Sequence, residues 1–216
     1  MNRRILILLA TLVPLLSGCF GAVAVGTGVG VLAYADRRTT ETQVTDEGIE
    51  LRAANRISEK FGSNTHVNVT SYNRTVLLTG EVPDAATKAE VEKIVAAVPN
   101  VKAISNELAI AGASSLASRS NDTYITSKVK ARFIDANQFA ANHVKVVTED
   151  GVVYLMGLVT QKEANAAVEI ARTTGGVKKV VRVFEIISEA EAQRLSGSGQ
   201  ASSGTPAQQA QPKPAQ

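Results

Sequence analysis

Cysteine and histidine are the residues of this chain best suited to chemistry, and both are scarce. The 216 residues include one cysteine, Cys19, and two histidines, His66 and His143. A zinc site needs three or four nitrogen, sulfur or carboxylate ligands, and no cluster of carboxylates flanks either histidine in the sequence. Each histidine stands just before a segment of alternating apolar residues, so a shared place in a repeat accounts for both. The sequence therefore predicts no metal site, no cofactor and no enzyme active site.

Cys19 has a different chemistry open to it, because it follows an apolar run that begins behind a pair of arginines ending at Arg4. The basic start, the apolar residues 5–16 and the small residues ending at Gly18 resemble a bacterial lipoprotein signal peptide. The resemblance implies removal of residues 1–18 and attachment of acyl chains to the thiol and the freed amine of Cys19. Each buried methylene contributes about 0.8 kcal/mol, so three chains would make the attachment permanent.

An uncleaved transmembrane anchor is the alternative interpretation of the same segment, since residues 5–35 are apolar enough to form one. Four glycines interrupt the second half of that run, at Gly21, Gly26, Gly28 and Gly30. The single cysteine also has no partner for a disulfide, which fits lipid attachment after export. We therefore expect a cleaved and lipidated chain.

Three residues at helical spacing are suited to contact with an anionic surface. Tyr124, Lys128 and Arg132 lie four residues apart, which places them on one side of a helix. A tyrosine ring suits the boundary between headgroups and acyl chains, and each basic group near an anionic membrane contributes about 1 kcal/mol. A solvated helix face with a half-buried tyrosine is the other interpretation. Lys130 could add charge from another face, and Phe139 could be either an inserted aromatic or a core residue.

The net charge argues against a general role in nucleic-acid binding. The chain carries 23 basic and 20 acidic residues. Two arginines belong to the predicted signal peptide, so 21 and 20 remain, a net charge of +1 that lacks a basic footprint. Residues 46–110 hold 7 basic and 9 acidic groups, whereas residues 122–187 hold 9 and 7. The second stretch is thus better suited to an anionic partner.

Those two stretches are copies of one unit, offset by 76 to 77 positions. The segment His-Val-Asn-Val at 66–69 returns as His-Val-Lys-Val at 143–146, and Val-Leu-Leu-Thr-Gly-Glu-Val at 76–82 returns as Val-Tyr-Leu-Met-Gly-Leu-Val at 153–159. The two stretches must therefore contain the same helices and strands in the same order. We expect two small domains in tandem.

Hydrophobic spacing predicts the elements of each unit. Apolar residues four apart predict a first helix with one buried stripe, formed by Ile49, Ala53, Ile57 and Phe61 in the first copy and by Ile125, Val129 and Phe133 in the second. Alternating apolar residues then predict a hairpin with one buried face, with turns at Asn73-Arg74 and Asp150-Gly151. A second helix begins at Pro83 or near Gln161, and a last strand covers 102–110 or 178–187. Helix starts are expected at Asp46 and Asp122, where carboxylates favour an N-terminus.

The order helix, strand, strand, helix, strand predicts an α+β fold in which each unit has a three-stranded mixed sheet packed on two helices. Paired units of this order, with Val-Leu-Leu-Thr-Gly at 76–80 and Val-Lys-Lys-Val at 177–180, resemble BON domains. Two of them behind a lipidated cysteine, with Ser-Asn-Asp-Thr-Tyr-Ile-Thr at 120–126, resemble the dual BON-domain lipoproteins of the Gram-negative outer membrane, the division and outer-membrane stress-associated lipid-binding family. The match covers roughly residues 16–187.

The resemblance implies a division of the chain into six parts: signal peptide 1–18, lipidated flexible tether 19–42, BON domain 43–111, linker 112–120, BON domain 121–188, and a disordered tail 189–216 rich in Ser, Gly, Gln, Pro and Ala. Phe20 after the cysteine, rather than aspartate, fits the sorting rule by which lipoproteins are delivered to the outer membrane. The implied location is the periplasmic face of that membrane.

The function implied by the resemblance is non-enzymatic. The second BON domain would bind anionic phospholipid, such as phosphatidylglycerol or cardiolipin, and the protein would support envelope integrity under stress. On this basis the candidate lipid-binding residues are Tyr124, Lys128, Arg132, Lys130 and Phe139. The alternative is a protein-protein adaptor for an outer-membrane assembly or cell-wall remodelling complex, with envelope proteins as partners.

Overall fold

The computed structural model describes residues 36–62 and 65–198. They form two domains with an α+β architecture, as expected, and both domains belong to one compact unit. The predicted signal peptide, Cys19 and the last residues of the predicted tail, 199–216, lie outside the described residues.

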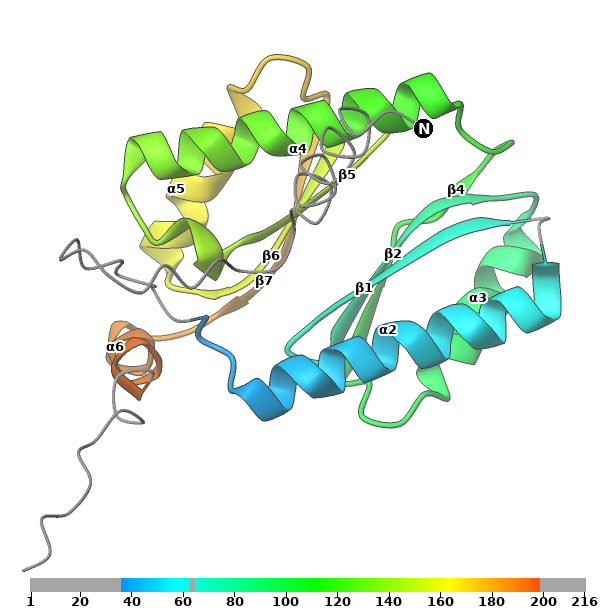
Figure 1. The fold of residues 1–216 in the computed structure, drawn as a ribbon, viewed down its shortest axis with the longest axis horizontal. Helices are drawn as coiled ribbons and strands as arrows, with labels where there is room; N and C mark the ends of the chain where they lie inside the picture. The colour runs from blue at the N-terminus through cyan, green and yellow to red at the C-terminus, as the bar shows by residue number, and fades with distance from the viewer. Residues whose placement is uncertain (1–35, 63–64, 199–216) are drawn as a thin grey trace, which may run out of the picture. The chain divides into compact units, whose positions relative to one another are not determined.

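The first domain follows the predicted order of elements. It comprises α2 (Thr40–Phe61), β1 (His66–Tyr72), β2 (Thr75–Val82), α3 (Ala85–Ala96), β3 (Ala103–Asn106) and β4 (Ala109–Ile110). Strand β2 lies in the centre, antiparallel to β1 and parallel to both β3 and β4, which are two pieces of the predicted last strand. Both helices cover the same face of this sheet (Figure 1).

The second domain repeats this arrangement. It comprises α4 (Leu116–Ala136), a 3₁₀ turn (Ala141–His143), β5 (Lys145–Glu149), β6 (Val152–Val159), α5 (Gln161–Arg172) and β7 (Lys179–Ile186). Strand β6 is central, antiparallel to β5 and parallel to β7. A further helix, α6 (Glu189–Ser198), follows the domain.

The predicted helical stripes form the core of each domain. In α2, Ile49 and Ala53 are fully buried against β2 residues such as Val76 and Leu78. In α4 the fully buried residues Ile125, Val129 and Phe133 pack against β5, β6 and α5. Burying an aliphatic or aromatic side chain contributes about 1.5–3 kcal/mol, so these stripes fix which face of each helix meets its sheet.

Both hairpin turns adopt the conformation that their sequences predict. Asn73 and Arg74 have φ angles of 50° and 65°, and Asp150 and Gly151 have φ angles of 46° and 72°. Positive φ at both central residues defines the tight turn that matches the twist of antiparallel strands. The prediction of two-residue turns is thus confirmed.

A buried aspartate holds each turn, which differs from the helix-start role expected for Asp46 and Asp122. The Asp46 carboxylate accepts hydrogen bonds from the backbone N–H groups of Asn73 and Arg74, at 2.8 and 2.7 Å. Asp122 accepts from Asp150 and Gly151 at 3.0 and 2.7 Å. The helices begin one to two turns earlier, at the caps Thr39 and Ser115, because the aspartates serve the hairpins instead of the helix ends.

The expected single buried face of the hairpins is wrong, since the central strands are buried on both faces. Side chains that point away from the helices form a third apolar cluster, which joins Tyr72 and Leu77 of the first domain to Tyr154, Met156 and Leu158 of the second. Two sheets that each expose an apolar face bury it by packing together. The two domains therefore share an interface built from their strands.

Two segments expected to be unpacked contribute to this interface or flank it. Leu195 of α6 packs against the third cluster, and Ala192 is buried, so residues 189–198 of the predicted disordered tail form an ordered helix. In the predicted tether, Arg37 is buried, and its guanidinium donates to Glu163 Oε2 and Oε1 at 2.7 and 2.9 Å and to the Leu158 carbonyl at 2.8 Å. Apolar contact and charge pairing thus extend the folded part at both ends.

The Arg37 contacts predict a pH-dependent contribution to stability. Arg37→Ala is expected to lower the free energy of unfolding by about 2 kcal/mol at pH 7, because it removes hydrogen bonds to a charged group. Burial acts to raise the pKa of Glu163, but hydrogen bonds from Arg37 and the Thr160 N–H outweigh it, so this pKa lies below its usual 4.5. The stabilisation is therefore complete above pH 4.5 and is lost as the pH falls through the lower value in the folded state.

Urea unfolding at several pH values measures this effect. The difference between the original chain and Arg37→Ala should shrink below about pH 4.5, and a difference that stays constant to pH 3 would contradict the assignment. Arg172→Ala is the control, because Arg172 pairs with Glu169 on an exposed helix surface. Exposed pairs contribute less than about 1 kcal/mol.

Candidate functional site

Helix α4 carries the residues that the sequence singles out for membrane contact. Its 21 residues, Leu116–Ala136, lie between the N-terminal cap Ser115, whose hydroxyl accepts from the Ser118 N–H, and the C-terminal cap Asn137, which has a left-handed conformation. Its buried stripe faces the sheet, so the residues between the stripe positions are turned outward. This geometry places Tyr124 on the outer surface of the helix, where its side chain is 62% exposed.

Tyr124 and Lys128 form one contact unit on this surface. The Lys128 ammonium lies 4.6 Å from the centre of the Tyr124 ring, within the range of a cation-π interaction. The same ammonium donates to the carbonyl of Gly175, in the turn after α5. A positive charge is thereby held beside an exposed aromatic ring.

Arg132 lies on the same side of the helix but is engaged with α5. Its Nη1 donates to the Ile170 carbonyl at 2.8 Å and to the hydroxyls of Thr173 and Thr174 at 3.1 and 2.8 Å. The last carbonyls of a helix lack partners within the helix, and a cation there also complements the helix dipole. Arg132 therefore ties α4 to the C-terminal end of α5 while its charge stays near the surface.

The two remaining candidates lie apart from this strip. Lys130 is exposed on another side of α4 and lines a cavity between the domains. Phe139 is buried in the core, and its ring packs edge-on against Phe133 with the ring centres 5.0 Å apart. Of the two roles considered for Phe139, the burial supports the core residue, which positions α4 from beneath.

Charge distinguishes α4 from its counterpart α2. Helix α4 has four basic and two acidic residues, a net charge of +2, whereas α2 has three basic and five acidic residues, a net charge of −2. Exposed aliphatic side chains do not separate them, because Val44 and Leu51 of α2 are each 63% exposed. Of the two helices, only α4 combines exposed apolar groups with a positive surface.

Two exposed aliphatic residues of α4, Leu116 at its start and Ile134 near its end, were not among the candidates from the sequence. Ile134 is 68% exposed, although it adjoins the fully buried Phe133. The signal was present in the sequence, since an isoleucine next to a stripe position falls outside the 125, 129, 133 pattern. Ile134 adds an aliphatic group near the C-terminal end of the positive helix.

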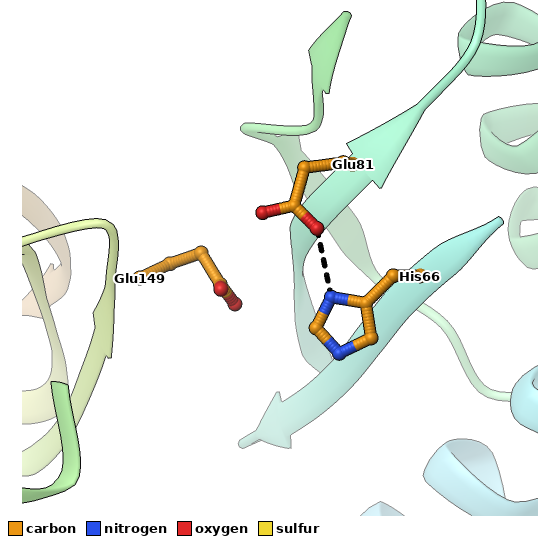
Figure 2. A group of neighbouring side chains, drawn as sticks. All are labelled: His66, Glu81 and Glu149. Atoms are coloured by element: carbon orange, nitrogen blue, oxygen red, sulfur yellow. Dashed lines mark hydrogen bonds and ion pairs between the residues drawn. The ribbon is translucent and has the colours of Figure 1, made fainter. Parts of the chain in front are cut away.

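The structure also brings together a polar cluster that the sequence did not predict. His66 Nδ1 lies 2.9 Å from Glu81 Oε2, and Glu149 of the other domain lies beside them (Figure 2). One ligand atom from each of the three residues lies within 4.8 Å of the others. No carboxylate cluster flanks either histidine in the sequence, but the fold brings Glu81 and Glu149 to His66. It also places Glu163 Oε1 3.8 Å from His143 Nδ1.

The two domains match the family model for the BON domain at residues 45–112 and 121–188. The chain belongs to the BON-domain family. The matched residues agree with the two units expected from the internal repeat, and the order of elements is the same in both. The α+β fold expected from the resemblance is thus confirmed.

Three curated relatives are similar to this chain over more than half of its length. The outer membrane lipoprotein DolP of Haemophilus influenzae is 37% identical over 86% of this chain and 96% of its own length. The 21 kDa hemolysin of Actinobacillus pleuropneumoniae is 33% identical over 70% of this chain and 79% of its own. The osmotically-inducible protein Y of Escherichia coli is 34% identical over 54% of this chain and 60% of its own.

Homology to an outer membrane lipoprotein over most of both chains confirms the location expected from the sequence. None of the three relatives carries the name of an enzyme. Among the helices of residues 36–62 and 65–198, none is both long enough and apolar enough to cross a bilayer.

Proposed function

We propose that this BON-domain protein is anchored to the outer membrane by acyl chains on Cys19 and binds anionic phospholipid through α4. The observation that carries the proposal is the pairing of exposed Tyr124 with the Lys128 ammonium on a helix of net charge +2. A tyrosine ring settles at the level of the headgroups, and the adjacent ammonium attracts their phosphates. Supporting envelope integrity would follow from this contact.

The roles within α4 differ among the candidates. Tyr124 and Lys128 would touch lipid, and Ile134 would add an aliphatic contact nearer the end of the helix. Arg132 would contribute charge while its hydrogen bonds keep α4 fixed on α5. Lys130 would add to the field from its own side, and Phe139 would support the helix from the core.

The acyl anchor and the helix would serve different purposes. Three acyl chains hold a protein at a membrane without help from its folded part. A weak contact from α4 would then select the lipid beneath the domain, because a tethered domain meets the bilayer at a high effective concentration. Phosphatidylglycerol and cardiolipin are the expected ligands, since both carry negative charge at neutral pH.

Vesicle binding tests the proposal with a fragment of residues 36–198, which retains Arg37 and α6. Lys128→Glu removes one positive charge and adds a negative one, about 2 kcal/mol at about 1 kcal/mol per charge. The affinity for phosphatidylglycerol vesicles should therefore fall by about 30-fold. Tyr124→Ala should also weaken vesicle binding, and a higher salt concentration should weaken vesicle binding by the original fragment.

The matched control is Arg52→Glu, because Arg52 occupies the position in α2 that Lys128 occupies in α4. It makes the same change of charge on the other domain and should leave vesicle affinity within about threefold, since a distant charge is screened beyond about 10 Å. Unchanged vesicle binding by a folded Tyr124→Ala, Lys128→Glu double variant would refute α4 as the lipid-binding element. Specific capture of an envelope protein without any affinity for anionic lipid would favour the adaptor function instead.

A further inference from the structure

The cluster of His66, Glu81 and Glu149 is built by three strands from two domains. His66 on β1 and Glu81 on β2 are direct partners in the antiparallel register, so both side chains leave the same face of the sheet. That face is the one turned away from α2 and α3, toward the second domain. Glu149, the last residue of β5, brings its carboxylate to the same place (Figure 2).

The internal repeat shows that this cluster is not inherited from a common unit. The second domain has His143 at the position of His66, but Leu158 stands at the position of Glu81. Glu149 in turn corresponds to Tyr72 of the first domain. Each domain therefore carries an acidic residue that its copy lacks, and the two acidic residues meet at one histidine.

Neighbouring groups hold both carboxylates in place. The Ser114 N–H donates to Glu81 Oε2 at 3.2 Å, and the Asn68 amide donates to Glu149 Oε2 at 2.9 Å. The Glu81 side chain is only 8% exposed. Such outer contacts orient ligating carboxylates in metal sites and increase affinity for the ion.

Bringing two carboxylates together in a partly dehydrated place is unfavourable without a cation. Both carboxylates are partly withdrawn from water, since the Glu81 side chain is only 8% exposed and Glu149 is half-buried. With a neutral imidazole the cluster carries a charge of −2. A divalent ion would neutralise that charge and replace the repulsion between the carboxylates with a favourable metal-oxygen contact to each of them.

We propose that His66, Glu81 and Glu149 form a zinc site that bridges the two BON domains. One imidazole and two carboxylates are a ligand set that zinc accepts, with a fourth position left for water. Calcium takes oxygen ligands, whereas one of these three ligands is an imidazole nitrogen, which zinc prefers. Metal-ligand bonds of about 2.0–2.2 Å place tetrahedral ligand atoms about 3.4 Å apart, so small side-chain rotations from the present separations suffice.

Water can reach the open position. His66 and Glu149 line a cavity of about 590 Å³ between the domains, and His66 and Glu81 also border a second cavity of about 360 Å³. An ion held here contacts ligands from both domains at once. It therefore stabilises the folded arrangement in which the sheets face each other, because only that arrangement assembles the complete ligand set.

Zinc titration of the full chain in detergent tests the site. Isothermal calorimetry should show one zinc ion bound per chain. Glu149→Gln and His66→Ala should each weaken zinc binding by at least about tenfold, since loss of an outer partner alone costs 10–100-fold. The control is Glu185→Gln, because Glu185 is another carboxylate at the domain interface, paired with Lys102 away from any histidine.

Thermal unfolding with and without zinc gives a second test, which distinguishes a metal ligand from a residue that only stabilises the fold. With a chelator present, Glu149→Gln should melt at the same temperature as the original chain or above it, because a neutral amide avoids the cost of burying charge. With zinc present, the original chain should melt at a higher temperature and the variant should not. The proposal fails if zinc does not bind at 100 µM, or if Glu185→Gln weakens binding as much as Glu149→Gln.

Discussion

Replacing Gly80 with alanine is expected to lower the free energy of unfolding of the first domain by more than about 4 kcal/mol, the range reserved for severe local disruption. A Cβ atom at Gly80 would lie 2.0 Å from the carbonyl oxygen of His66 on the paired strand. Gly80 also has a φ of 107°, in the region that side chains disfavour. The neighbour is backbone, so relief requires β1 and β2 to separate.

Three other glycines separate the two causes. At Gly157, the equivalent position, a Cβ would lie 2.4 Å from the His143 carbonyl without a positive φ, so Gly157→Ala measures the clash alone. Gly62 has a φ of 58° and no atom within 4 Å of the added Cβ, so Gly62→Ala measures conformational strain, about 1–2 kcal/mol. Gly112→Ala meets neither obstacle and should stay within about 0.5 kcal/mol.

Urea unfolding followed by circular dichroism and by a probe in each domain measures these variants, since two domains need not unfold in one step. We expect the loss to be largest for Gly80→Ala, then Gly157→Ala, then Gly62→Ala. If Gly80→Ala is no more destabilising than Gly62→Ala, the close approach of the strands is not what requires glycine. The repeated glycine would then need another explanation.

The close approach of the backbone segments also explains why glycine occupies the same position in both copies of the repeat. The two glycines recur because the backbone carbonyl of His66 or His143 faces them in each hairpin. Any residue type would present the same carbonyl, so this contact requires glycine but does not require histidine. The repeat was therefore the right account of the backbone at both positions. The side chains of the two histidines have different surroundings, with Glu81 and Glu149 near His66 and Glu163 near His143.

Local patterns predicted the elements because their causes are local. A stripe such as Ile125, Val129 and Phe133 reflects the helical period, and Asp150-Gly151 reflects the φ angles of one turn. The second buried face of β2 and β6 could not be predicted in the same way. It depends on contact between Leu77 of one domain and residues such as Met156 of the other, and neither strand pattern specifies its partner.

The sequence predicted the candidate site only in part, because spacing along a helix reports local neighbours and not contacts with other elements. Spacing alone placed Tyr124 and Lys128 together, and the structure pairs them. Spacing could not show that Arg132 would donate to the carbonyl of Ile170 on another helix. Nor could it show that Glu149 would meet His66, because only the packing of two sheets creates that meeting.

The second large effect is expected at Asp46. Its carboxylate is buried and accepts from the Ser71 hydroxyl at 2.7 Å, from the Asn73 and Arg74 N–H groups at 2.8 and 2.7 Å, and from Arg38 Nη1 at 2.8 Å. Asp46→Ala should lower the free energy of unfolding by about 3–5 kcal/mol, because it leaves several buried donors without their acceptor and removes one of the two carboxylates that pair with Arg38. The free energy of unfolding of Asp46→Asn should lie between those of the original chain and Asp46→Ala, since one amide oxygen replaces two carboxylate oxygens.

The equivalent Asp122→Ala should cost less, about 2–3 kcal/mol, because Asp122 accepts from the N–H groups of Asp150 and Gly151, whereas Asp46 also accepts from Ser71 and Arg38. Glu47→Ala is the control, since Glu47 adjoins Asp46 on α2 but is exposed, and its effect should stay within about 0.5 kcal/mol. Equal losses for Asp46→Ala and Glu47→Ala would contradict the role of the buried carboxylate. Losses at Asp46 and Asp122 that exceed the loss at Glu47 would support the conclusion that α2 and α4 each stabilise the hairpin turn of their own domain. Helix and hairpin of a BON unit then depend on each other for stability.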